Sequence, residues 1–174
     1  MRQDVQIEII GSLESSEALE ALAEAVAEEG RVDWGAGFSD GSEAARHIIE
    51  CAGKNESIVL TRSDTNYPFD NVTEVCRKYG LSYRMELGDT GCEFLDTIIA
   101  WKPGMDEPFE ASVDGHEIRV PLSEISAASV KGLDAVKELV DRYREGVMAD
   151  MKGGITVAPE VVKAFEEEAD APRP

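Results

Sequence analysis

The most apolar run of the chain lies within residues 57–101, and this stretch constrains the fold more than any other. Its pattern predicts a strand, a polar loop over residues 61–68, a helix that Gly80 ends, and two further strands separated by a tight turn. The short apolar run at residues 58–60 is typical of an inner strand covered on both faces. We therefore expect residues 57–101 to form the middle of a β-sheet.

The segments on either side continue this alternation of strands and helices. Residues 5–10 alternate as a buried strand does, and the helix that follows runs to Glu29 and stops at Gly30. A short strand is predicted at residues 31–35, and a further helix begins after Asp40, which is a suitable N-cap. One long helix near the C-terminus is predicted from an apolar stripe made by Val130, Leu133, Val136, Leu139, Val140, Tyr143 and Val147.

A β-hairpin is predicted over residues 109–120. Asp114-Gly115 has the composition of a type I′ turn, and apolar residues alternate on both sides of it. With these two residues at the centre of the turn, the predicted pairs are Val113 opposite His116, Ala111 opposite Ile118, and Phe109 opposite Val120.

This order of elements predicts an α/β (α+β) fold. Residues 5–35 and 57–87 each have a strand–helix–strand pattern, so we expect a βαβ-type N-terminal half. The predicted fold is a mixed β-sheet. It contains this βαβ-type N-terminal half and an antiparallel hairpin region, and a long C-terminal helix follows. The length of 174 residues fits one domain, which we assign to residues 1–148. Residues 149–174 are predicted to form an acidic C-terminal segment, partly helical and mobile.

Charge narrows the classes of partner. The chain has 36 acidic residues against 17 Lys and Arg, which gives a net charge of −19. Direct binding to nucleic acid needs a basic face that releases counterions, and anionic membrane surfaces attract basic segments, so neither partner is expected. The partners that remain are cations, basic proteins, and proteins that normally grip phosphates.

Sequence motifs for catalysis are missing. The chain has no phosphate-binding glycine loop and no nucleophile elbow, and its two histidines, His47 and His116, are far apart. We therefore expect no cofactor and no metal. Three cysteines and no apolar leader at the N-terminus indicate reduced thiols in a cytoplasmic protein.

Acidic residues follow an ordered pattern. Glutamates three or four residues apart on the first helix stand about 5 to 6 Å apart along its axis, which resembles the spacing of backbone phosphates. No Lys or Arg lies within that helix, and none lies between Lys102 and Arg119, where a second acidic run occurs. The candidate partner-binding residues are Glu14, Glu17, Glu20, Glu24, Glu28, Asp106, Glu107 and Glu110.

A polar loop provides an alternative site. Open α/β sheets bind ligands beyond the carboxyl ends of their strands, and this loop follows a predicted inner strand. An arginine there could hold a carboxylate or phosphate, and an aspartate could act as a base. The same residues could equally cap the next helix and form local turns. The candidate ligand-binding residues are Arg62, Asp64, Asn66 and Tyr67.

These observations favour a non-catalytic, acidic domain that binds a basic, nucleic-acid-handling protein as a nucleic-acid mimic or inhibitor. In composition the chain resembles the small, acidic inhibitors that phages and plasmids direct against DNA-binding defence proteins. That resemblance implies an anti-defence role. A small-molecule-binding protein or enzyme using the Arg62–Tyr67 loop is the alternative, and adaptation to high salt is another explanation of the charge.

Overall fold

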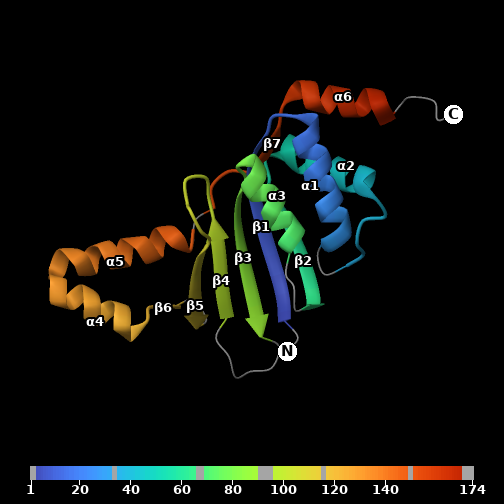
Figure 1. Cartoon of the computed structure of the whole chain (residues 1–174). Helices are drawn as coiled ribbons and strands as arrows, with labels where there is room; N and C mark the ends of the chain where they lie inside the picture. The colour runs from blue at the N-terminus through green and yellow to red at the C-terminus, as the bar shows by residue number, and fades with distance from the viewer. Residues whose placement is uncertain are drawn as a thin grey trace.

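The structure, a computed structural model, describes residues 3–32, 35–65, 69–89, 96–114, 117–148 and 151–169. In this part of the chain a mixed sheet of seven strands is combined with six helices (Figure 1). The α/β fold class and the mixed sheet agree with the sequence prediction. The strands are β1 (Gln3–Leu13), β2 (Ile58–Thr65), β3 (Ser82–Asp89), β4 (Asp96–Trp101), β5 (Phe109–Asp114), β6 (Glu117–Arg119) and β7 (Ile155–Val157).

Strand β1 is the centre of the sheet. The strand order is β2-β1-β3-β4-β5-β6 with every neighbour antiparallel, and β7 pairs in parallel with the end of β1. Val5, Ile7 and Ile9 of β1 are fully buried on one face. The expectation that residues 58–60 form an inner strand is therefore wrong, because β1 lies between β2 and β3 and leaves β2 at the edge.

The two strands β2 and β3 form a split βαβ unit. Both run antiparallel to β1, so they are parallel to each other with β1 inserted between them. Helix α3 (Asp70–Tyr79) connects them. The short strand predicted at residues 31–35 is reduced, among the described residues, to bridges from Arg31 to Gly37 and to Thr61.

Helices α1 (Ser16–Glu29), α2 (Gly41–Lys54) and α3 cover one face of the sheet. Leu19, Leu22 and Val26 of α1 bury their side chains against the apolar face of β1 in one core cluster. Helix α1 lies between α2 and α3 and contacts both (Figure 1). Side chains of Ser15 and Asp40 accept hydrogen bonds from the first turns of α1 and α2, and α2 begins after the N-cap that the sequence predicts, Asp40.

The β5–β6 hairpin has a different register from the predicted one. Val113 pairs with Ile118, and Asp114 pairs with Glu117, so the pair Phe109 opposite Val120 is wrong by two residues. Asp114 is the last residue of β5 and not the centre of the turn; Gly115 and His116 lie outside the described residues. An ion pair from Arg119 to Asp114 crosses the hairpin and stabilises this register.

A break at Gly132 divides the predicted long helix into α4 (Leu122–Lys131) and α5 (Leu133–Gly146). The backbone of Gly132 has φ of 112°, which only glycine adopts readily. The C-terminal half of α5 packs on β4 and β5 in a second core cluster, where the rings of Tyr143 and Phe109 meet edge to face at 5.1 Å. The hairpin of α4 and α5 extends beyond the edge of the sheet (Figure 1).

The C-terminal segment contains β7 and α6 (Pro159–Ala169). Ile155 of β7 and Val161 of α6 are buried in the same cluster as α1–α3. The division of the chain at residue 148 stays a prediction.

The described cysteines, Cys51 and Cys76, are buried free thiols. Burial raises the pKa of the Cys76 thiol far above its usual range, so this group stays protonated at neutral pH. Within the described residues, no helix has both the length and the apolar character that crossing a membrane requires.

Candidate functional site

The glutamates of α1 are held on the side of the helix that faces away from the sheet. Glu17, Glu20, Glu24 and Glu28 lie within an arc of about 80° at 100° per residue, and all four side chains are exposed. Glu14 precedes the helix, is also exposed, and accepts a hydrogen bond from Ser12 Oγ. The row divides into two groups by what its members contact.

The first group contacts α3. Tyr79 Oη and Lys78 Nζ donate hydrogen bonds to Glu17 Oε1 at 2.8 and 3.3 Å, and these two donors lower the pKa of that carboxyl. Asn71 Nδ2 donates to Glu28 Oε2 at 3.1 Å. A basic residue of α3 therefore offsets part of the row, which the sequence of α1 alone does not reveal.

Glu29, which the sequence analysis did not select, caps helix α3. Its Oε1 accepts from the backbone N of Asn71 at 3.2 Å, and its Oε2 accepts from that of Val72 at 3.1 Å. The N-cap residue of α3, Phe69, has φ of 52° and no side-chain cap. The carboxylate of Glu29 therefore satisfies backbone donors that would otherwise lack partners and lies at the positive end of the helix dipole.

We expect Glu29→Ala to lower the free energy of unfolding by about 1 kcal/mol, the typical cost of losing a helix cap. Urea denaturation followed by circular dichroism measures it. The matched control is Glu20→Ala on the same helix, because the side chain of Glu20 is exposed and makes no hydrogen bond in the described part of the chain. Its effect should stay within about 0.5 kcal/mol. Equal effects of the two variants would show that Glu29 does not cap α3.

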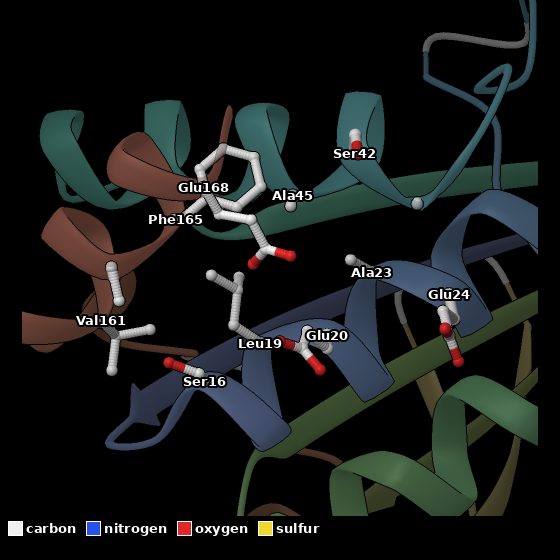
Figure 2. Close-up of a pocket in the computed structure, with 12 residues that line it drawn as sticks. Ser16, Leu19, Glu20, Ala23, Glu24, Ser42, Ala45, Val161, Phe165 and Glu168 are labelled. Atoms are coloured by element: carbon white, nitrogen blue, oxygen red, sulfur yellow. The ribbon is translucent and has the colours of Figure 1, made fainter. Parts of the chain in front are cut away.

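The second group of α1 glutamates borders a groove between α1, α2 and α6. Glu20 and Glu24 from α1 and Glu168 from α6 line this groove, which has a volume of about 250 Å³ (Figure 2). Ser16 and Ser42 are its other polar side chains. We call this site the acidic groove; its apolar lining is Leu19, Ala23, Ala45, Val161, Ala164 and Phe165.

Cations are missing from the lining of the acidic groove. Within the described residues, no Lys or Arg forms an ion pair with Glu20, Glu24 or Glu168. Carboxylates around an apolar floor can hold the charged end of a Lys or Arg side chain while its methylenes, or a neighbouring apolar side chain, contact the floor. The groove therefore combines three acidic residues with an apolar floor.

The second predicted acidic run lies elsewhere. Asp106 and Glu107 are exposed in the connection from β4 to β5, and Glu110 is exposed on β5. None of the described hollows is lined by both acidic sets. The acidic groove therefore contains Glu20 and Glu24 and none of the other six candidate residues.

The predicted ligand loop is partly a strand. Strand β2 continues to Thr65, so Arg62 and Asp64 belong to an edge strand and not to a loop. Strand β1 is long enough to pair with β2 as far as Thr65. The register of this pairing shifts between Gln3 and Val5. Arg62 lines an open hollow with Glu28 and Glu29, among others. Asn66 and Tyr67 lie outside the described residues.

Basic side chains gather on the opposite face of the sheet. Lys102, Arg144 and Lys152 line an open hollow with Ile10 and Ser82. Ile10 follows Ile9, which points into the helix-covered core, so this hollow and the acidic groove are on opposite faces. Glu145 also lines this hollow, so both signs of charge are present there.

Sequence reasoning missed Glu168 as a site residue. An acidic run at the end of α6 is visible in the sequence, but the packing of α6 beside α1 is a long-range contact that no local pattern reports.

Among the described residues, no group of three or more His, Cys, Asp or Glu side chains is arranged to hold a metal ion. Comparison with protein-family models, curated proteins and solved structures finds no match to the chain.

Proposed function

We propose that the protein binds a basic protein surface through the acidic groove. The observation that carries this proposal is the gathering of Glu20, Glu24 and Glu168 around an apolar floor without a cation in the lining. A partner that presents Lys or Arg around an apolar side chain would fit, with its apolar group on the floor and its cations at the rim. Such a pairing of an apolar anchor with complementary charge is common in specific interfaces.

A nucleic-acid-handling protein is the class of partner that we propose. Glu20 and Glu24 are four residues apart, which places them about 6 Å apart along the helix axis. Proteins that bind nucleic acid neutralise its phosphates with Lys and Arg, and carboxylates can pair with the same side chains. The net charge of −19 would steer such a basic protein toward this chain. Binding would then compete with nucleic acid, as an inhibitor of a DNA-binding defence protein does.

Displacement of DNA from a basic peptide tests the proposal. The probe is a synthetic amphipathic helix with arginines around a leucine stripe, bound to fluorescently labelled duplex DNA. We expect the protein to release the DNA, and Glu20→Gln/Glu24→Gln/Glu168→Gln to need about tenfold more protein, since three exposed charge pairs contribute about 1.4 kcal/mol together. Fluorescence anisotropy of the DNA is the measurement, repeated at higher salt, which should weaken release.

The matched control removes the same number of charges elsewhere. The side chains of Glu74, Glu117 and Glu138 are exposed and form no ion pair or hydrogen bond in the described part of the chain. The triple Gln variant at these positions should release DNA as the wild type does. If both triple variants lose activity equally, only bulk charge matters and the groove is not the site. Absence of release by the wild type would also contradict the proposal.

Two alternatives predict different results. Salt adaptation predicts that the wild type gains stability as salt is raised, with no effect of the groove variant on any partner. A small-molecule site at Arg62 predicts loss of ligand binding in Arg62→Ala, again without an effect of the groove variant.

A further inference from the structure

Large exposed apolar side chains gather on the α4–α5 hairpin. Among the described residues, the large apolar side chains that the structure exposes all belong to these two helices. Val130 is 91% exposed, Leu133 is 70% exposed and Val140 is 44% exposed. Leu122 and Ile125 complete the set. A gathering of this kind on a soluble protein marks an interaction site more often than chance exposure.

Part of the apolar stripe of α5 stays exposed in the single chain. Leu133, Val136, Val140, Tyr143 and Val147 repeat at intervals of three and four residues along one side of the helix. Tyr143 and Val147, near the C-terminal end, are buried against the sheet. The hairpin extends past β5 (Figure 1), and Leu133 and Val140 stay exposed on it. Helix α4 covers one flank of α5, where Glu124 accepts from Tyr143 Oη at 3.0 Å.

Charge indicates what covers this stripe. Residues 122–147 contain five acidic residues (Glu124, Asp134, Glu138, Asp141, Glu145) and four basic ones (Lys131, Lys137, Arg142, Arg144), a net charge of −1. The other 148 residues therefore carry −18 of the total of −19. Two copies of so acidic a chain repel each other through most of their surfaces. The hairpin is the part where two copies can approach with little repulsion and bury apolar surface.

We propose that two copies of this chain associate through their α4–α5 hairpins. A closed dimer uses the same patch of both subunits about a twofold axis, and two helical hairpins meeting in this way form a four-helix arrangement with an apolar centre. Leu133 and Val140 supply that centre. The acidic groove lies over the β1–β2 end of the sheet, away from the hairpin, so each dimer presents two free grooves. The dimer does not depend on the proposed function of the groove.

Sedimentation velocity over a range of protein concentrations tests the proposal. We expect the wild type to sediment with twice the chain mass of 18.9 kDa. Leu133→Asp/Val140→Asp should sediment as a monomer, because the dimer would bury four new carboxylates close together. Folding should survive, since both side chains are exposed in the single chain, and circular dichroism checks it.

A control variant separates the hairpin from bulk charge. Lys54→Gln/Lys163→Gln reaches the same net charge at exposed positions of α2 and α6, where the surface ion pairs that it removes contribute little. This variant should remain a dimer. The uncharged single variant Leu133→Gln should weaken the dimer without threatening the fold.

Three outcomes would overturn the proposal. The first is a wild type that stays monomeric at all concentrations, which would leave the hairpin to a different protein. The second is a double Asp variant that still forms a dimer. The third is a control variant that dissociates as much as the double Asp variant.

Discussion

Gly154→Ala should lower the free energy of unfolding by about 3 kcal/mol, at the upper end of what an overpacked site costs. A Cβ at this position would lie 2.3 Å from the carbonyl carbon of Asn55 and 2.4 Å from its oxygen. These atoms are backbone, so no side chain can rotate away. Asn55 is the left-handed C-cap of α2, and Ile155 N donates to Glu56 O at 2.9 Å, so both segments are held in place.

Thermal unfolding measures this effect. A loss of 3 kcal/mol corresponds to a fall in Tm of roughly 6–12 °C for a domain of this size. The matched control is Gly53→Ala, because Gly53 lies within α2 and nothing approaches its Cβ position within 4 Å. That variant should raise stability by about 0.5–1 kcal/mol, since alanine loses less backbone entropy in a helix. A Gly154→Ala variant as stable as the wild type would mean that β7 does not pack against the end of α2.

The periodicity of the sequence predicts the helices and the faces of the strands well. Residues 5–10 alternate correctly because one face of β1 is buried under helices and the other is partly exposed. Ser15 and Asp40 mark the beginnings of α1 and α2 because their side chains bond to the first helical turn, which is a local interaction. Features decided within a few residues can therefore be found from the sequence.

The hairpin register shows where local information is insufficient. The predicted and the observed registers differ by two residues, so both leave Val113 and Ile118 on the same face. Because side chains alternate with a period of two, the apolar pattern cannot separate these registers. The ion pair of Arg119 with Asp114 favours the observed register, and it forms only after the strands pair.

Strand order and the acidic groove depend on contacts that are remote in sequence. Nothing in residues 57–101 reveals that β1 inserts between β2 and β3. Two parallel strands joined by a helix have the same strand–helix–strand order along the chain whether they are neighbours or have another strand between them. Glu168 joins Glu20 and Glu24 only because α6 packs near α1. The acidic character of the surface is therefore predictable, and the particular carboxylates that share a groove are not.

The C-terminal segment offers the largest expected loss of stability. Ile155 is 0% exposed and pairs with Gly11, and Val161 is 3% exposed in the same core cluster. Ala158 N also donates to Leu13 O at 3.0 Å, which ties the start of α6 to the end of β1. These contacts make β7 and α6 part of the core that α1 and α2 share, although the sequence analysis treats residues 149–174 as a separate, mobile segment.

We expect Ile155→Ala/Val161→Ala to lower the free energy of unfolding by about 4 kcal/mol, since both changes remove buried methyl groups and leave cavities. Chemical denaturation measures the loss, and the urea dependence of the transition reports whether the segment unfolds with the rest of the chain. The matched control is Glu166→Ala on the exposed side of α6, which should change stability by less than about 0.5 kcal/mol. If the double variant loses no more than the control, residues 149–174 are dispensable for the core and the division at residue 148 is correct. A loss near 4 kcal/mol in one cooperative transition would instead make the segment part of a single folding unit, and would fix α6, with Glu168, at the rim of the acidic groove.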